Sequence, residues 1–145
     1  VIDANVAVWA VLPKIAVVST VGRLAQWSQQ QQPIIVPNFW VAETTSVVRQ
    51  LIYSKVISVE QDQTALNDLF ALEIEILPLT LELCHRALVW ATHFQQSKVY
   101  DSLYVALAEQ RQAEFWTGDK RLVNRARQLK LNWVRWVVES ETHNT

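Results

Sequence analysis

The stretch YDSLYVALAEQ, residues 100–110, places one carboxylate at the head of a segment that is otherwise mostly apolar. Asp101 is followed by the run from Leu103 to Ala108, so a helix here would be apolar on nearly every side. A helix of that kind belongs in the interior of a protein. The stretch therefore predicts a core helix that begins with an aspartate. A carboxylate at the head of a buried helix needs a partner, which is either the backbone of the helix itself or a ligand.

Strand and helix patterns alternate on both sides of this core helix. Short β-branched or alternating runs predict strands at residues 1–2, 34–37, 73–78, 114–117 and 132–138. Helices are predicted at residues 15–31, 39–54, 58–72, 80–96, 101–112 and 119–129. Because all the connections are short, the alternation predicts a parallel sheet covered by helices on both faces. No linker or repeat divides the chain, so we expect a single domain over residues 1–145.

The composition restricts the class of protein. Half of the 145 residues are hydrophobic and 19% are charged, as in a folded globular protein. The net charge of −1 predicts that any nucleic acid would bind to a local basic patch. One cysteine cannot form an internal disulfide, and no apolar run approaches the ~20 residues of a membrane span, so a cytoplasmic protein is expected. Two glycines are too few for a glycine-rich phosphate loop.

Four carboxylates are predicted to meet at one edge of the sheet. Asp3 and Asp119 each follow a strand, Asp101 heads the core helix, and Glu43 lies at the border of an apolar helix stripe. Ligand sites of open α/β sheets lie outside the carboxyl ends of the strands. Taken singly, Asp101 and Asp119 could be ordinary helix N-caps, and Glu43 could be a solvated helix residue. Taken together, clustered like charges require raised pKa values or a cation, and oxygen ligands suit Mg²⁺ or Mn²⁺.

The chain resembles the PIN domain family, and within it the VapC-type ribonuclease toxins. The stretches that carry the resemblance are VIDANV (1–6), VPNFWVAETTSVVRQ (36–50), YDSLYVALAEQ (100–110) and TGDKRLVNRAR (117–127). The resemblance implies a Rossmann-like three-layer α/β/α sandwich with a central parallel sheet of about five strands. It also implies a homodimer, a cognate antitoxin protein and an RNA substrate.

The same resemblance assigns the residues of the expected site. Asp3, Glu43, Asp101 and Asp119 match the acidic quartet that holds Mg²⁺ or Mn²⁺. Asn5 matches a polar position of the first motif, and Thr117 matches the hydroxyl of the T-x-D motif. The expected reaction is hydrolysis of RNA phosphodiester bonds, which leaves 5′-phosphate and 3′-hydroxyl ends. RNA contacts are expected from five basic residues: Lys98, Lys120, Arg121, Arg125 and Arg127.

Two other functions compete with the ribonuclease. A non-catalytic PIN-like module that binds RNA or protein would be signalled by the loss of an acid, and all four acids are present. A phosphatase of the haloacid-dehalogenase type would need a second acid two residues after Asp3, where this chain has Asn5.

Overall fold

The computed structural model describes residues 1–12, 14–15 and 18–138. Residues 16–17 of the helix predicted over 15–31, and residues 139–145 of the expected domain, lie outside this part. In chain order the elements are α1 (Ala4–Val11), α2 (Val18–Gln29), β1 (Ile34–Pro37), α3 (Trp40–Tyr53), α4 (Val59–Ala71), β2 (Ile74–Leu77), α5 (Leu81–Phe94), α6 (Tyr100–Gln110), β3 (Phe115–Thr117), α7 (Lys120–Gln128) and β4 (Val134–Trp136).

The strand segments are parallel, as predicted, but in the described residues they do not form one continuous five-stranded sheet. β1 pairs with β2, β3 pairs with β4, and Ile2 forms an isolated parallel bridge with Trp116 of β3. The amide of Trp116 donates to the carbonyl of Val1 at 2.8 Å, and the amide of Asp3 donates to the carbonyl of Trp116 at 3.2 Å. The first strand is therefore reduced to one bridged residue, because helix α1 begins immediately after Asp3.

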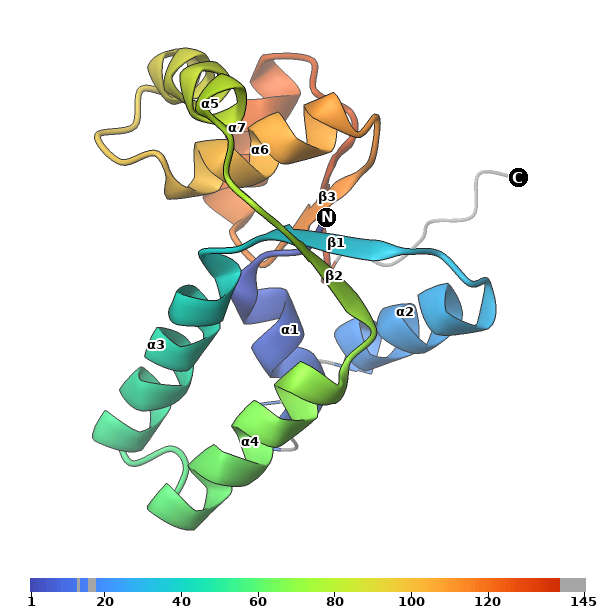
Figure 1. The fold of residues 1–145 in the computed structure, drawn as a ribbon, viewed down its shortest axis with the longest axis vertical. Coiled ribbons are helices and arrows are strands. Elements are labelled where there is room, and N and C mark those ends of the chain that lie inside the picture. Colours follow the sequence, from blue (N-terminus) through green and yellow to red (C-terminus); the bar gives the residue numbers. More distant parts are fainter. Residues whose placement is uncertain (13, 16–17, 139–145) are drawn as a thin grey trace.

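Helices cover the strands in two groups, which gives the α/β/α layering that the alternation predicts. Figure 1 shows α1, α2, α3 and α4 on one side of β1 and β2, and α5, α6 and α7 on the other. Within the first group α1 packs against the other three helices, and within the second α5 packs against both α6 and α7. No helix in the described ranges combines the length and the apolar character needed to cross a membrane.

Local sequence signals explain several of the helix starts. The capping box predicted at Ser58 is present, with the Ser58 amide donating to Oε1 of Gln61 at 2.9 Å. Thr80 caps α5 by accepting from the amide of Leu83 at 3.1 Å. Helix α1 was not predicted, because the valines in it favour strands over helices. Its N-cap is Asp3, whose side chain accepts from the amide of Val6.

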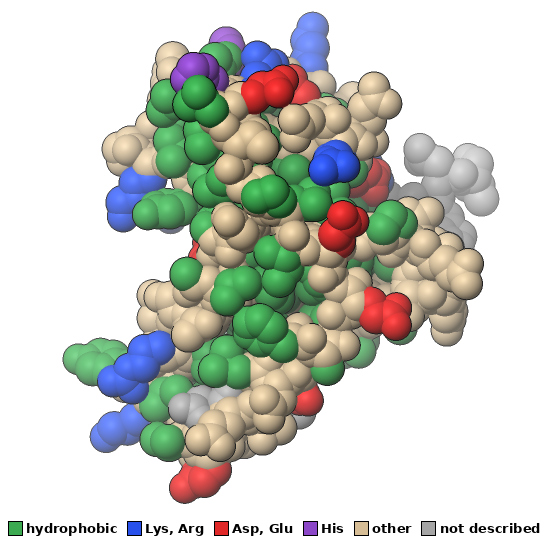
Figure 2. All heavy atoms as spheres, viewed as in Figure 1, with side chains coloured by type: hydrophobic (Ala, Val, Ile, Leu, Met, Phe, Trp, Pro, Cys, Tyr) green, Lys and Arg blue, Asp and Glu red, His purple; other side chains and the backbone are tan. Residues whose placement is uncertain are grey.

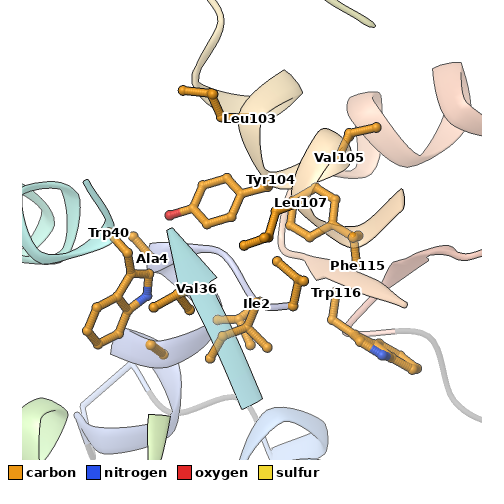
Figure 3. Packing of buried hydrophobic residues seen from close by; sticks show 14 of the residues in the cluster. Ile2, Ala4, Val36, Trp40, Leu103, Tyr104, Val105, Leu107, Phe115 and Trp116 are labelled. Atoms are coloured by element: carbon orange, nitrogen blue, oxygen red, sulfur yellow. The ribbon is translucent and has the colours of Figure 1, made fainter. Parts of the chain in front are cut away.

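The core helix of the opening stretch is buried as predicted. All residues of α6 from Ser102 to Ala108 are buried, and Tyr104 has no exposed surface. Figure 3 shows Tyr104 and Leu107 beside Phe115 of β3 and above Val36 of β1. The helix lies on the strands and leaves only its N-terminal turn, with Asp101, at the carboxyl edge of the sheet. Packing therefore fixes the position from which Asp101 projects.

Candidate metal centre

Asp3 is the most enclosed of the four carboxylates and has the most partners. Its exposed fraction is 8%. Oδ1 accepts from the amide of Val6 at 2.8 Å, and Oδ2 accepts from the Thr117 hydroxyl at 2.5 Å and the Gly118 amide at 3.2 Å. Burial raises the pKa of Asp3 from 3.8 to about 6, helped by the charge of Asp101 and opposed by these three hydrogen bonds.

This raised pKa predicts how Asp3 affects stability. A carboxyl whose pKa is higher in the folded protein binds its proton more tightly there than in the unfolded chain. Its contribution to the free energy of unfolding is therefore favourable below about pH 4 and is lost as the pH rises towards about 6. A shift from 3.8 to about 6 corresponds to roughly 3 kcal/mol. Asp3 is thus a strained group near neutral pH unless a cation compensates its charge.

The turn Thr117–Gly118–Asp119 joins β3 to α7 and carries a second acid, Asp119, just after the Thr117 hydroxyl that binds Asp3. Thr117 is buried, and its Oγ1 donates to Asp3 while accepting from the Asp119 amide at 3.0 Å. Asp119 is exposed and caps α7, because its Oδ1 accepts from the amides of Arg121 at 2.8 Å and Leu122 at 3.2 Å. The capping role weighed for Asp119 is confirmed. Its Oδ2 accepts no hydrogen bond from the described residues and remains available as a ligand.

Glu43 projects from the first turn of α3 towards the core helix and is only partly exposed. Its Oε2 accepts from the hydroxyl of Tyr104 at 2.5 Å, which is a short distance for a hydrogen bond. Burial raises the pKa of Glu43, and the charges of Asp3 and Asp101 raise it further against the effect of the Tyr104 hydrogen bond. Burial and these same acids hold the pKa of Tyr104 above its ordinary value, so the phenol keeps its proton and acts as a donor.

Asp101 lies in the first turn of α6 but does not cap it, since Val99 occupies the N-cap position. Oδ2 of Asp101 accepts from Nε2 of Gln96 at 2.8 Å, and Oε1 of Gln96 accepts from the hydroxyl of Ser102 at 3.1 Å. Burial raises the pKa of Asp101 above its ordinary value, with the charge of Asp119 adding to the effect. Asp101 is therefore not the N-cap that the sequence allowed, and its carboxylate instead accepts a hydrogen bond from Gln96 in the loop before α6.

The four carboxylates influence one another electrostatically across one edge of the fold. Asp3 couples to Asp101, Glu43 couples to Asp3 and Asp101, and Asp101 couples to Asp119. Figure 2 shows a recess between α3 and the helices above it, in which acidic atoms are visible. This edge is where α/β sheets place their ligand sites. We call Asp3, Glu43, Asp101 and Asp119 the acidic edge.

The donor set of the acidic edge fits a hard divalent cation in its chemistry. Burial raises the pKa of Asp3, Glu43 and Asp101 and so favours the protonated carboxyl groups. A bound divalent cation would favour the ionised carboxylates, whose oxygens are its preferred ligands. In the part of the chain that the structure describes, no three His, Cys, Asp or Glu side chains are arranged closely enough to hold a metal ion. One oxygen each of Asp101, Asp119 and Glu43 already accepts a hydrogen bond, which leaves the other oxygen of each carboxylate for a cation.

The remaining predicted residues lie at different distances from this edge. Asn5 belongs to α1, next to Asp3 in the chain, but its side chain is exposed and has no hydrogen bond among the described residues. Lys98 is exposed in the loop before α6. On α7, Lys120 lies over the ring of Trp136 with its Nζ 4.6 Å from the centroid, and Arg125 donates to Oε1 of Gln95. Arg121 and Arg127 are exposed on the same helix.

A cavity lies between Asp119 of the acidic edge and the basic side chains of α7. Its volume is about 230 Å³, and it is lined by Phe94, Gln96, Asp119, Arg121, Leu122 and Arg125. A larger cavity of about 540 Å³ lies at the opposite ends of the strands, beside Val1, Ile34 and Glu114, and includes none of the acidic-edge residues. The smaller cavity is the relevant one, because it joins a predicted ligand to two predicted RNA contacts.

The residues that orient the acids were not predicted from the sequence. Tyr104 and Gln96 donate to Glu43 and Asp101, and the Gly118 amide donates to Asp3. Tyr104 could have been predicted, because it lies three residues after Asp101 and so on the same face of the helix. The sequence contains no comparable signal for Gln96, whose orientation depends on the buried Ser102.

Among known proteins, the chain matches one family. The model of the family described as "PIN domain" matches residues 1–128. No curated protein matches the chain.

Proposed function

Because the chain belongs to the PIN domain family, whose members are generally metal-dependent nucleases, we propose that it is a Mg²⁺- or Mn²⁺-dependent endoribonuclease. The observation that carries this proposal is the acidic edge. Three of its members, Asp3, Glu43 and Asp101, have pKa values raised by burial and by the charge of at least one other acid of this edge. Buried, mutually repelling carboxylates at a strand edge are costly unless they serve a ligand, and a divalent cation is the ligand that they suit.

In this proposal each acid has a defined task. Asp3, Asp101 and Asp119 hold the cation directly, and Glu43 holds it through a water molecule or orients that water. When bound, the ion would lower the pKa of a water molecule and neutralise the charge that develops on the phosphate. Thr117 keeps Asp3 in place through its 2.5 Å hydrogen bond. Asn5 would contact water or a phosphate oxygen from its exposed position next to Asp3.

The substrate would approach along α7. Arg121 and Arg125 line the cavity beside Asp119, so they could pair with phosphates that flank the cleaved bond. Lys98, Lys120 and Arg127 would extend this basic surface. A local patch of this kind can guide RNA to an acidic site although the net charge of the chain is −1.

The wider biological setting follows from the resemblance described above. We propose that the chain is one domain that acts in the cytoplasm as the toxin of a type II toxin–antitoxin pair. The toxin would be a homodimer, and its antitoxin would block the acidic edge with a basic side chain in place of the cation.

A cleavage assay tests the proposal directly. RNA incubated with the protein and Mg²⁺ or Mn²⁺ should be cut to fragments with 5′-phosphate and 3′-hydroxyl ends, and EDTA should stop the reaction. Asp101→Asn should also stop it. Asp68→Asn is the matched control, because Asp68 is an exposed aspartate on α4. RNA binding without cleavage under all metal conditions would replace the nuclease with the non-catalytic binding module. Cleavage that continues in EDTA would refute metal dependence.

A further inference from the structure

Tyr104 is a buried residue whose hydroxyl reaches the acidic edge. It lies in α6 three residues after Asp101, with no exposed surface. Its hydroxyl donates to Oε2 of Glu43 at 2.5 Å, across 61 residues of sequence. Glu43 belongs to α3, so this hydrogen bond joins helices from opposite layers of the fold. The contact therefore links the helix that carries Asp101 to the one that carries Glu43.

The ring of Tyr104 is held from two directions. It stacks on Phe115 of β3 with the centroids 5.4 Å apart and the planes 8° from parallel. Phe39, at the start of α3, meets it edge-on with a centroid distance of 5.0 Å. Figure 3 shows the hydroxyl pointing away from Phe115 towards the helix that carries Trp40. The phenol is thus a fixed group, whereas the partly exposed Glu43 side chain has several rotatable bonds.

Packing alone does not account for a tyrosine at this position. A phenylalanine would present the same ring to Phe115 and Phe39, and it would bury no polar atom. A buried hydroxyl without a partner would be destabilising, and Glu43 is the partner that the structure provides. What the hydroxyl adds is thus control over where one carboxylate points.

We propose that Tyr104 is a positioning residue, whose fixed hydroxyl selects the side-chain conformation in which Glu43 faces the cation site of the acidic edge. This inference rests on the proposed metal-dependent function. It assigns to Tyr104 the role that outer partners commonly have around metal ligands, where their loss lowers metal affinity or activity by roughly 10- to 100-fold. The residue does not touch the substrate, and it acts through Glu43.

The first test is Tyr104→Phe, which removes the oxygen and keeps the ring. We expect the dissociation constant for Mn²⁺, measured by calorimetry without RNA, to rise by about tenfold or more. The kcat for RNA cleavage should fall by a similar factor while KM stays unchanged. Tyr100→Phe is the matched control, because Tyr100 lies on the same helix and against the same Phe39, but its hydroxyl has no partner among the described residues. That control should bind Mn²⁺ and cleave RNA like the parent.

A double-mutant cycle then separates positioning from structural support. In a Glu43→Ala background, Tyr104→Phe should change neither the Mn²⁺ dissociation constant nor kcat, because the carboxylate that it positions is gone. An equal loss in both backgrounds would refute the inference, and so would parent-like values for Tyr104→Phe alone. Thermal melting of each variant shows whether it is folded. If Tyr104→Phe does not fold, Glu43→Gln, which keeps an acceptor for the phenol, should retain more Mn²⁺ affinity than Glu43→Ala, and equal losses would refute the inference.

The proposed function and this inference fail in different ways. A parent protein that binds no Mn²⁺ and cleaves no RNA would refute the function and, with it, the inference. A parent that does both, with a Tyr104→Phe variant that matches it, would refute the inference alone.

Discussion

The two glycines of the chain should respond to alanine substitution in opposite ways. An ideal Cβ on Gly118 would lie 2.5 Å from Cζ3 of Trp9, whereas one on Gly22 would meet nothing within 4 Å. Neither glycine has a positive φ, so alanine is compatible with both backbones. The comparison therefore isolates the contact between Gly118 and the Trp9 ring.

The magnitudes follow from these distances. Carbon atoms in contact are normally about 3.5–4.0 Å apart, so Gly118→Ala would create an overlap of about 1 Å with a ring that is itself packed against the core. Overpacking of this kind costs roughly 1–3 kcal/mol. For a chain of 145 residues each kcal/mol lowers Tm by about 3–4 °C. Gly22 is exposed inside helix α2, where alanine should raise stability by about 0.5–1 kcal/mol.

Thermal and urea denaturation of both variants would measure these changes. In a Trp9→Leu background the effect of Gly118→Ala should become small, because the ring that it meets has been removed. Gly118→Ala should also weaken Mn²⁺ binding, since the Gly118 amide donates to Asp3 at 3.2 Å. A Gly118→Ala protein as stable as the Gly22→Ala protein, or one that stays unstable without Trp9, would refute the reasoning.

Three further predictions concern the acidic edge and helix α7. In metal-free buffer, Asp101→Asn should leave Tm unchanged or raised while abolishing cleavage, because one like charge is removed; a much lower Tm would make Asp101 a structural residue. In EDTA, the parent should melt at a higher temperature at about pH 5 than at about pH 7.5, because Asp3 loses its proton over that range, and Asp3→Asn should reduce the difference. Equal melting temperatures in the parent would contradict the raised pKa. Reversing Arg121 and Arg125 to glutamate should slow RNA cleavage and flatten its dependence on salt while Mn²⁺ still binds, and an unchanged salt slope would show that RNA enters elsewhere.

The order of elements was predictable because it depends on local signals. The strand at residues 34–37 has the predicted bounds, since proline follows three β-branched residues. The helix after Ser58 begins where its capping box predicts. Helix α1 was missed because its N-cap, Asp3, also suits the end of a strand, and the bridge to Trp116 that shortens this strand is not visible in the sequence. The continuity of a sheet depends on such distant pairings, so the number of strands was the weakest prediction.

The candidate site, like the fold, was predictable only where it depends on local sequence features. The four acids were assigned to one edge because strand ends and helix starts are local features, but among the described residues no three of them lie close enough to hold a metal ion. Their individual roles could not be predicted, since Asp119 is a cap, Asp101 is not, and Asp3 is held by Thr117 from 114 residues away. Tyr104 shares a helix face with Asp101 and could have been predicted, whereas Gln96 became evident only from its hydrogen bond to Asp101 in the structure.

The pairing of the first residues with Trp116 has a consequence during synthesis of the chain. Ile2 and Asp3 find their partners, Trp116 and the Thr117 hydroxyl, only after another 114 residues have been made. Contacts between the two ends of a chain form late and slowly, because a long intervening segment must first be ordered. The acidic edge is therefore incomplete in any nascent chain that has not yet reached Thr117.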